Sequence, residues 1–219
     1  MPYRQTERVI RRLSARREAI LAAACAALAE QGIAAVQIIP VAQRAGIAAG
    51  TVYRYFPSKA DLLAAVVRMV SEQEIAALDQ AAAQAPGPLS ALAAAVTTFA
   101  ARAISRRRLV LALMTQPGEP ELETVILSFR RAVAGSFEKL IRAAVGAQHL
   151  QDQDAAVAAT ALLGAVMEGL IGPLAPPCHD RAQMRAQVQA LTLFGLRALA
   201  VPDARARGLV VHTTVPPKC

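Results

Sequence analysis

Three side chains that can donate hydrogen bonds, Thr51, Tyr53 and Arg54, stand close together within residues 49–55. If this segment is a helix, Val52 faces the protein interior and the three donors face largely outward. The residues just before Thr51 are Ala or Gly, so the positive N-terminal end of the helix can come close to an anion. An outward arginine of this kind can form two hydrogen bonds to a guanine edge in the DNA major groove. The segment is therefore a candidate surface for reading DNA.

The sequence predicts short helices that hold this segment in place. Residues 40–45 form one short helix with a proline in its first turn, and Gly46 then allows the left-handed turn that reverses the chain. Residues 49–55 form the next helix, which ends before Pro57 because the residue before a proline disfavours the helical conformation. A long helix follows, capped by Ser58 and with an acidic residue at its third position. Two helices joined by a glycine turn are typical of a helix-turn-helix, whose second helix enters the major groove.

The positive charge of the chain is concentrated in its first quarter. Residues 1–60 contain nine Lys and Arg and three acidic residues, so they carry +6 of the formal net charge of +8. Such an asymmetry is typical of a region that meets a polyanion, most simply nucleic acid. A solvated arginine-rich segment would produce the same charge pattern, so the motif has to decide between the two interpretations.

Composition predicts an all-α protein. Hydrophobic residues make up 55% of the 219 residues and aromatic residues only 4%, and the apolar residues are largely Ala and Leu, which are strong helix formers. Helical periodicity predicts about nine helices, the first with Ser14 as its N-cap and Gly32 as its stop. We expect these segments in order: a basic, possibly disordered arm at 1–15, a helix-turn-helix DNA-binding domain at 16–60, a connecting helix at 61–85, a second helical domain at 86–201 and a flexible tail at 202–219.

Other classes of protein fit the sequence poorly. The longest apolar run free of charge and proline, 155–167, is shorter than the about 20 residues that a membrane helix needs. The arginine-rich start has no apolar region of the kind that a secretory signal needs, so we expect a cytoplasmic protein. Cys25, Cys178 and Cys219 have no CxxC spacing and predict neither a disulfide framework nor a zinc site. Because phosphate-binding, dinucleotide-binding and nucleophile motifs are also missing, we expect no cofactor, no metal site and no enzymatic activity.

A long and specific motif lies within residues 20–63. It consists of Val41-Ala42-Gln43-Arg44-Ala45-Gly46-Ile47 followed by Gly50-Thr51-Val52-Tyr53-Arg54-Tyr55-Phe56-Pro57-Ser58-Lys59-Ala60-Asp61-Leu62-Leu63. In these residues the chain resembles the TetR-type transcriptional repressors. The rest of the chain is similar to that family only in being helical and of suitable length.

The resemblance implies which residues contact DNA. Gln37 stands where the family usually has a phosphate-contacting Thr, and Gln is a poor N-cap, so Pro40 has to fix the start of that helix instead. With Ala at both 48 and 49, base reading rests mainly on the three outward donors and on Arg44. Tyr53 and Tyr55 cannot share one helical face, and Tyr55 is the better candidate for the core. The predicted DNA-binding residues are Arg16, Gln37, Arg44, Ala48, Ala49, Thr51, Tyr53, Arg54, Tyr55 and Lys59.

The helices after Pro88 are implied by the resemblance to bind a ligand and to form a dimer. Residues 152–171 are apolar around most of the helix, so they need burial on several sides, and 181–201 offer a partner with Gly195 as a point of close approach. A second copy of this pair would complete a four-helix interface in a homodimer, although a core helix within one chain is the alternative. An inducer pocket would lie among the middle helices, and ordinary core packing is the favoured alternative for each possible wall residue. These residues are Phe99, Arg102, Met114, Phe129, Phe137 and Met167.

Two functions follow from this sequence. The first is a ligand-responsive repressor of the TetR type that binds a palindromic operator in double-stranded DNA as a homodimer and is released by a small-molecule inducer. The second is a constitutive or architectural DNA-binding dimer without a physiological ligand. An apolar cavity among the middle helices would favour the first function, and a fully packed core would favour the second.

Overall fold

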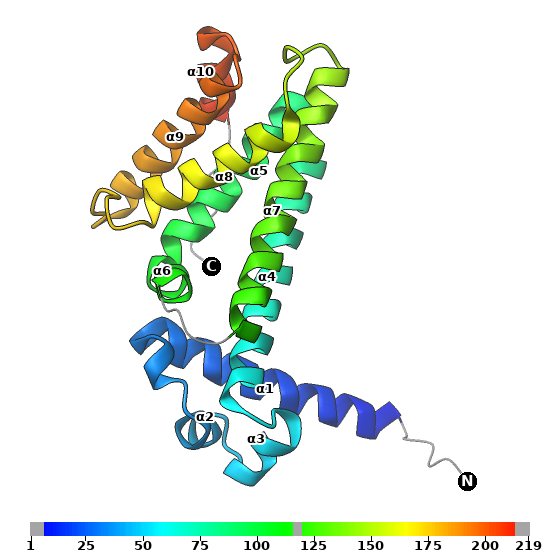
Figure 1. Ribbon diagram of the computed structural model, residues 1–219, viewed down its shortest axis with the longest axis vertical. Coiled ribbons are helices and arrows are strands. Elements are labelled where there is room, and N and C mark those ends of the chain that lie inside the picture. Colours follow the sequence, from blue (N-terminus) through cyan, green and yellow to red (C-terminus); the bar gives the residue numbers. More distant parts are fainter. Residues whose placement is uncertain (1–6, 116–119, 213–219) are drawn as a thin grey trace. The chain divides into compact units, whose positions relative to one another are not determined.

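The computed structural model describes residues 7–115 and 120–212, and within these ranges the chain contains helices and no strand. The prediction of an all-α fold is confirmed. Ten α-helices and one short 3₁₀ helix follow one another along the described residues (Figure 1). Their bounds are α1 (Glu7–Gln31), η1 (Ile33–Ala35), α2 (Ile38–Arg44), α3 (Ala49–Tyr55), α4 (Lys59–Ala83), α5 (Pro88–Ser105), α6 (Arg107–Thr115), α7 (Pro120–Gly146), α8 (Ala155–Leu170), α9 (Arg181–Ala198) and α10 (Asp203–His212).

The chain divides into two compact units. The first unit holds the chain up to Val70 together with the segment 112–126, and the second unit holds Ser71–Leu111 and the chain from Leu127 onward. The first unit contains the predicted helix-turn-helix. The second unit contains the pair of helices expected to dimerise.

Four helices enclose the apolar core of the first unit. Full burial of one such aliphatic side chain contributes about 1.5–3 kcal/mol to stability. The buried side chains are Ile20, Ala24 and Leu28 of α1, Val41 and Ala42 of α2, Val52 of α3, and Leu62, Leu63 and Val66 of α4. In the two long helices they recur at three- and four-residue spacing, as with Ile20, Ala24 and Leu28 of α1, which is the pattern of a helix with one buried face.

The start of α4 is fixed by a reciprocal cap. The backbone N–H of Asp61 donates to the Ser58 hydroxyl at 3.0 Å. In return, the Asp61 carboxylate accepts from the N–H of Ser58 at 3.1 Å and from its hydroxyl at 2.8 Å. The predicted capping role of Ser58 is confirmed.

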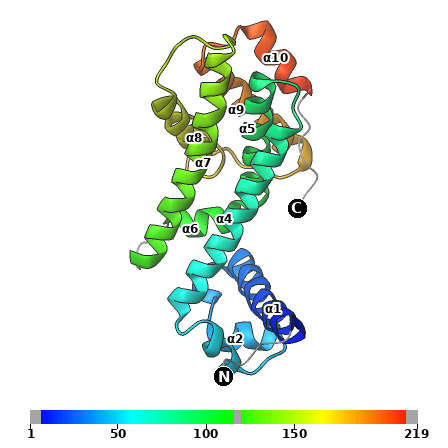
Figure 2. The same ribbon diagram turned by 90° about the vertical axis from the view of Figure 1, so that its right-hand side faces the viewer.

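The second unit is built around α5. This helix packs against α8, α9 and α10, and Figure 2 shows it within the bundle. Among the described helices it alone is long and apolar enough to cross a membrane by length and composition, but 72% of it is buried inside the protein. A core helix in a bundle passes the same test, so α5 is interpreted as core.

The contact between α8 and α9 is close at one point. Gly195 of α9 is buried, and a Cβ atom added there would lie 2.5 Å from Cδ1 of Leu162 on α8. The predicted close approach at Gly195 is therefore confirmed. Both helices begin at aspartate N-caps: Asp154 accepts from the N–H groups of Ala156 and Val157, and Asp180 accepts from that of Gln183.

A group of three charged side chains lies inside the second unit. The Glu74 carboxylate of α4 accepts hydrogen bonds from Arg102 Nε at 2.6 Å and Nη2 at 2.9 Å, and from Arg106 Nη1 at 2.8 Å. The Glu74 side chain is only 7% exposed and that of Arg102 is 14% exposed. Because a buried carboxylate is tolerated only when it is paired and hydrogen-bonded, this cluster joins α4 to α5.

The first helix starts earlier than predicted. α1 begins at Glu7, so the prediction of a helix start at residue 16 is wrong, and residues 7–15 of the expected arm are helical. Ser14 is not an N-cap, because its hydroxyl donates to the Glu18 carboxylate at 2.9 Å within the helix. Pairs four residues apart, such as this one and Arg11 with Glu7, support a helix without apolar burial. Residues 1–6 of the expected arm lie outside the described residues.

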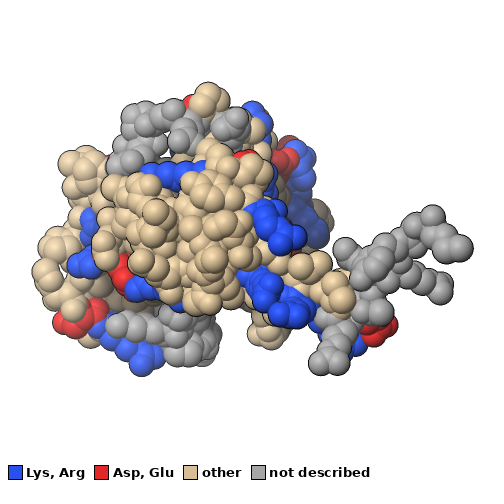
Figure 3. Space-filling view, turned by 90° about the horizontal axis from the view of Figure 1, so that it is seen from below, with Lys and Arg blue, Asp and Glu red and all other residues tan. Residues whose placement is uncertain are grey.

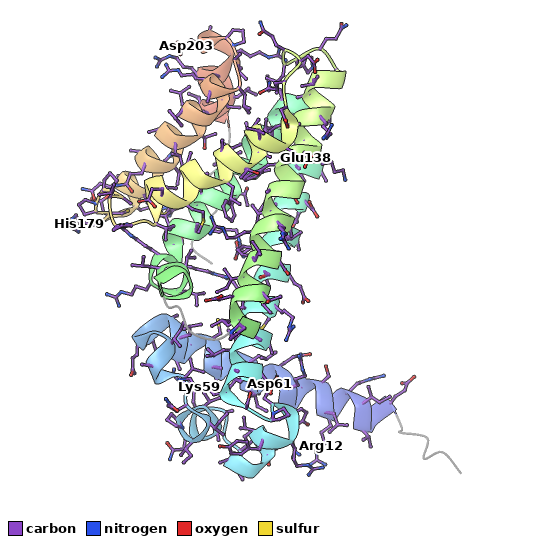
Figure 4. All side chains as sticks on the ribbon, viewed as in Figure 1. Arg12, Lys59, Asp61, Glu138, His179 and Asp203 are labelled. Atoms are coloured by element: carbon purple, nitrogen blue, oxygen red, sulfur yellow. The ribbon has the colours of Figure 1, made fainter. Side chains whose placement is uncertain are left out.

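The C-terminal segment is also more ordered than predicted. Residues 203–212 form α10, so the prediction of a flexible tail is wrong there, and residues 213–219 lie outside the described residues. Ala206 and Val210 are buried in the core that α10 shares with α5 and α9. The carboxylate of Asp203, labelled in Figure 4, accepts from Arg207 and Arg197, and these two guanidinium groups lower the pKa of that carboxyl below its usual value.

Candidate nucleic-acid interface

A glycine turn joins α2 to α3. Gly46 has φ 67°, which is left-handed backbone that glycine adopts without steric cost. Its N–H donates to the carbonyl of Gln43 at 3.1 Å, and the N–H of Ile47 donates to that of Ala42 at 3.0 Å. This pair of bonds is the Schellman arrangement that ends a helix and redirects the chain. It fixes the direction in which α3 leaves α2.

Replacing Gly46 with alanine should destabilise the first unit. No atom lies within 4 Å of an added Cβ, so the cost is conformational and amounts to about 1–2 kcal/mol for a left-handed alanine. Gly50→Ala is the matched control, because Gly50 lies within α3 with open space around it and alanine there should stabilise the helix by up to about 1 kcal/mol. Chemical denaturation measures both changes, and equal stability of the two variants would contradict the role given to Gly46.

The two faces of α3 differ as predicted. Val52 and the following Phe56 are buried in the core of the first unit. Tyr53, with 53% of its surface exposed, and Arg54 point into solvent, while Thr51 is half-buried. The polar side of α3 is therefore open to a partner, and its apolar side holds it to the neighbouring helices.

The starts of the two short helices lack side-chain caps. Gln37 is the N-cap residue of α2, but its amide donates to the carbonyl of Ala34 at 3.1 Å and caps no helix N–H. Ala48 holds the same position on α3 and has no group that could cap it. The N–H of Thr51 donates to the carbonyl of Ala48 at 2.8 Å, so the N–H groups of Ala49 and Gly50 are those left for another acceptor, such as a phosphate. α2 begins at Ile38, two residues before the predicted start at Pro40, so the proline sits inside the first turn.

Arg44 has a partner that the sequence pattern did not indicate. Its guanidinium donates to both carboxylate oxygens of Glu30 on α1, at 2.8 and 2.7 Å. Both side chains are exposed, at 41% and 50%, and surface pairs of this kind contribute at most about 1 kcal/mol. A guanine or phosphate contact by Arg44 therefore has to compete with Glu30.

A second contact missed from the sequence lies at the end of α3. The guanidinium of Arg17 on α1 lies 5.5 Å from the ring centroid of Phe56, the C-cap residue of α3, which is a cation–π arrangement. The signal that could have revealed it is spacing: Arg17 shares a helical face with Ile20, Leu21 and Ala24, all buried. An arginine on an apolar stripe needs a partner such as an aromatic ring.

The other predicted DNA-binding residues lie on the same unit. Arg16 is exposed on α1, Ala48 is exposed before α3, and Ala49 and Tyr55 are half-buried on it. Lys59 is half-buried at the first position of α4, and Figure 4 shows it near Asp61 at this end of the chain's long helix. The structure thus brings the outward side of α3 and Lys59 at the start of α4 into one unit.

The six predicted pocket residues do not share one environment in the structure. Phe99 and Phe137 are buried against each other, edge to face, with ring centroids 5.9 Å apart. Met167 is buried in the same core and Phe129 packs on it half-buried. Arg102 binds Glu74, and the side chain of Met114 lies outside the described residues. These contacts are those of a packed core, and a role for these residues in binding a ligand stays a prediction. Among the described residues, no group of three His, Cys, Asp or Glu could hold a metal ion.

The helix-turn-helix region matches a known protein family. Residues 20–66 match the family of bacterial regulatory proteins described as the tetR family. The transcriptional repressor KstR of Mycolicibacterium smegmatis is 40% identical over 101 residues, which are 46% of this chain and 49% of KstR. The chain therefore spans about half the length of the curated relatives it matches.

Solved structures of regulators share the fold over most of the chain. A transcriptional regulator of the TetR/AcrR family from Thermobifida fusca is 25% identical, with a TM-score of 0.67 over 83% of this chain and 96% of that one. The regulator FadR from Bacillus subtilis, solved in complex with stearoyl-CoA, has a TM-score of 0.68 and 19% identity, over 85% of this chain and 98% of FadR. With the glycine turn, the buried Val52 and the outward donors of α3, these similarities show that residues 20–66 form a helix-turn-helix domain that matches the tetR family of bacterial regulatory proteins, in a chain that shares the fold of such regulators.

Proposed function

We propose that the protein is a transcriptional repressor that binds a palindromic operator as a homodimer and is released by a small-molecule inducer. The observation that carries the proposal is the outward side of α3, where Tyr53 and Arg54 are exposed while Val52 is buried. A helix held in this way can enter the major groove and place an arginine on a guanine edge. Binding to DNA puts the site of action in the cytoplasm.

An uncovered apolar face in the second unit supports the homodimer. Val157 on α8 and Phe194 on α9 are 65% and 57% exposed. Ala161, Ala186 and Ala190 are also exposed on these two helices and offer a smooth surface for close packing. A two-fold pairing of α8 and α9 would cover both large side chains at once. It would also present two copies of α3 to half-sites about one helical turn, ~34–36 Å, apart.

The release by an inducer is supported by the fold and by a neighbour with a ligand. FadR, which shares the fold, was solved with stearoyl-CoA bound. A ligand that prefers one arrangement of the dimer would weaken operator binding by its difference in affinity for the two states. The second candidate function, a constitutive DNA-binding dimer, is favoured by the tight contacts of Phe99 and Phe137. A screen for compounds that release the protein from DNA separates the two functions.

Arg54→Ala tests whether α3 reads bases. Loss of a bidentate arginine–guanine contact should weaken operator binding by about 1–3 kcal/mol, or roughly 5- to 150-fold, and should change binding to random DNA much less. The measurement is a competition between the DNA upstream of the protein's own coding region and a random duplex of equal length. Arg68→Ala, which removes an exposed arginine of α4 in the same unit, is the matched control. Equal losses on operator and random DNA would count against base reading by Arg54.

A further inference from the structure

The first part of α1 is a helix that the rest of its unit does not cover. Every side chain described from Val9 to Ala19 is exposed, and burial begins only at Ile20. Figure 1 shows this part of α1 reaching out from the other helices of the first unit. An isolated helix of about 12 residues is marginal in water, so it persists here as a continuation of the buried part. Residues 7–19 are called the α1 extension below.

Among its described side chains, the α1 extension carries two arginines that are available to a partner. Arg11 is paired with Glu7 at 2.9 Å, and Arg17 lies over Phe56. Arg12 and Arg16 are exposed and form no ion pair or hydrogen bond with another described residue. They stand four residues apart, so they follow one another on the same side of the helix with about 6 Å between them along its axis.

The C-terminal end of the α1 extension lies next to α3. Because Arg17 contacts Phe56 at the C-terminal end of α3, the extension leaves the first unit beside the surface proposed to enter the major groove. From Arg17 to Glu7 the helix spans ~15 Å at 1.5 Å per residue, which equals about 4 base pairs of duplex at 3.4 Å each. Figure 4 shows Arg12 on the α1 extension, in the same unit as α3, and Figure 3 shows Lys and Arg side chains at several places on the face seen from below.

We propose that the α1 extension continues the DNA-binding surface beyond α3: Arg12, together with the already predicted contact residue Arg16, binds backbone phosphates that flank the half-site read by α3. This inference rests on the proposed function, since it takes the same duplex as the ligand. Phosphate contacts by arginine carry no sequence information, so the extension adds affinity and fixes orientation while α3 supplies specificity.

The apolar residues of the α1 extension have to be weighed against this proposal. Val9, Ile10 and Leu13 are exposed, and Val9 and Leu13 stand three residues before Arg12 and Arg16, so they lie beside these arginines. A basic amphipathic helix of this kind can also lie on an anionic membrane. This apolar stripe is short, however. It is interrupted at the next turn by Arg17, which the structure holds on Phe56. Charge therefore outweighs apolar area on the extension, and DNA is the partner that also fits its position beside α3.

The experiment measures how DNA affinity depends on salt. Arg12→Ala together with Arg16→Ala removes both phosphate ligands and keeps a strong helix former at each position. Each lost phosphate contact should lower the slope of log K against log salt by about 0.9, so a dimer should lose about 3–4. The control is Arg130→Ala together with Arg131→Ala, which removes the same charge from exposed positions of α7. The duplexes are a random sequence of about 40 base pairs and the upstream fragment trimmed in steps of about one turn, ~10 base pairs.

On the random duplex, the proposal predicts that the slope of log K against log salt falls for the Arg12 and Arg16 variant and not for the control. It also predicts that this variant loses the affinity that the wild type gains from DNA flanking the operator. An unchanged slope, or an equal drop in the control, would overturn it. Binding of the wild type to phosphatidylserine vesicles that the variant loses, with the DNA slope unchanged, would overturn it in favour of a membrane. Because the random duplex needs no operator, the result stands apart from the proposed function, which fails instead if the wild type does not prefer the upstream fragment.

Discussion

Aspartate at both Val157 and Phe194 should convert the protein into a monomer and weaken operator binding by at least about 10³-fold, towards its affinity for random DNA. These residues are the two large apolar side chains left exposed on α8 and α9. Two carboxylates per chain in the centre of a packed two-fold interface would be buried without partners, which costs several kcal/mol per group. A monomer presents one copy of α3, and one short helix reads too few base pairs for specific binding.

Sedimentation measures the oligomeric state of this variant, and a competition assay measures its affinity. The matched control is aspartate at Leu127 of α7 and Val211 of α10, which are also exposed apolar residues of the second unit, at 47% and 69%. It adds the same charge and removes similar apolar surface, so it should remain a dimer with unchanged operator affinity. A dimeric Val157 and Phe194 variant, or a monomer that keeps full operator affinity, would contradict the proposed interface.

Glu74→Gln should lower the stability of the second unit by about 3 kcal/mol, since removing one partner of a buried ion pair leaves charge without compensation. The Glu74 carboxylate accepts three hydrogen bonds from Arg102 and Arg106, and its side chain is 7% exposed. A neutral amide is a weaker acceptor and can take these bonds only in part. For a protein of this size we expect a drop in Tm of ~6–12 °C.

The control for this change is Glu138→Gln on α7. Glu138, labelled in Figure 4, pairs with Arg142 one turn away, and the Arg142 side chain is 66% exposed. A surface pair of this kind contributes less than about 1 kcal/mol, so the control should melt close to the wild type. If the Glu74 variant melts at the same temperature as the control, the buried cluster does not join α4 to α5 as inferred.

The sequence predicts most of the DNA-reading unit because its signals are local. Gly46 marks a left-handed turn, Ser58 with Asp61 marks a helix start, and the apolar spacing around Val52 marks the inner face of α3. Each of these signals involves residues within one or two turns of each other, where backbone geometry alone fixes the outcome.

The features that sequence reasoning missed are of two kinds. Some depend on contacts between residues far apart in the sequence, and others are helices that have few buried apolar side chains. The pair of Arg44 with Glu30 and the cluster around Glu74 join separate helices, and residue type alone does not select such partners. The α1 extension lacks the apolar burial that helix prediction relies on. α10 follows Pro202 directly and has a weak apolar pattern, so only its packing against α5 and α9 distinguishes it from a tail.

Methylation protection of DNA tests the central claim most directly, because it reports which groove α3 occupies. With the upstream fragment, the account predicts protection of guanine N7 atoms in the major groove in two segments about 10 base pairs apart, and loss of that protection at symmetric guanines with Arg54→Ala. Protection confined to adenine N3 in the minor groove, or guanine protection that Arg54→Ala leaves unchanged, would contradict it.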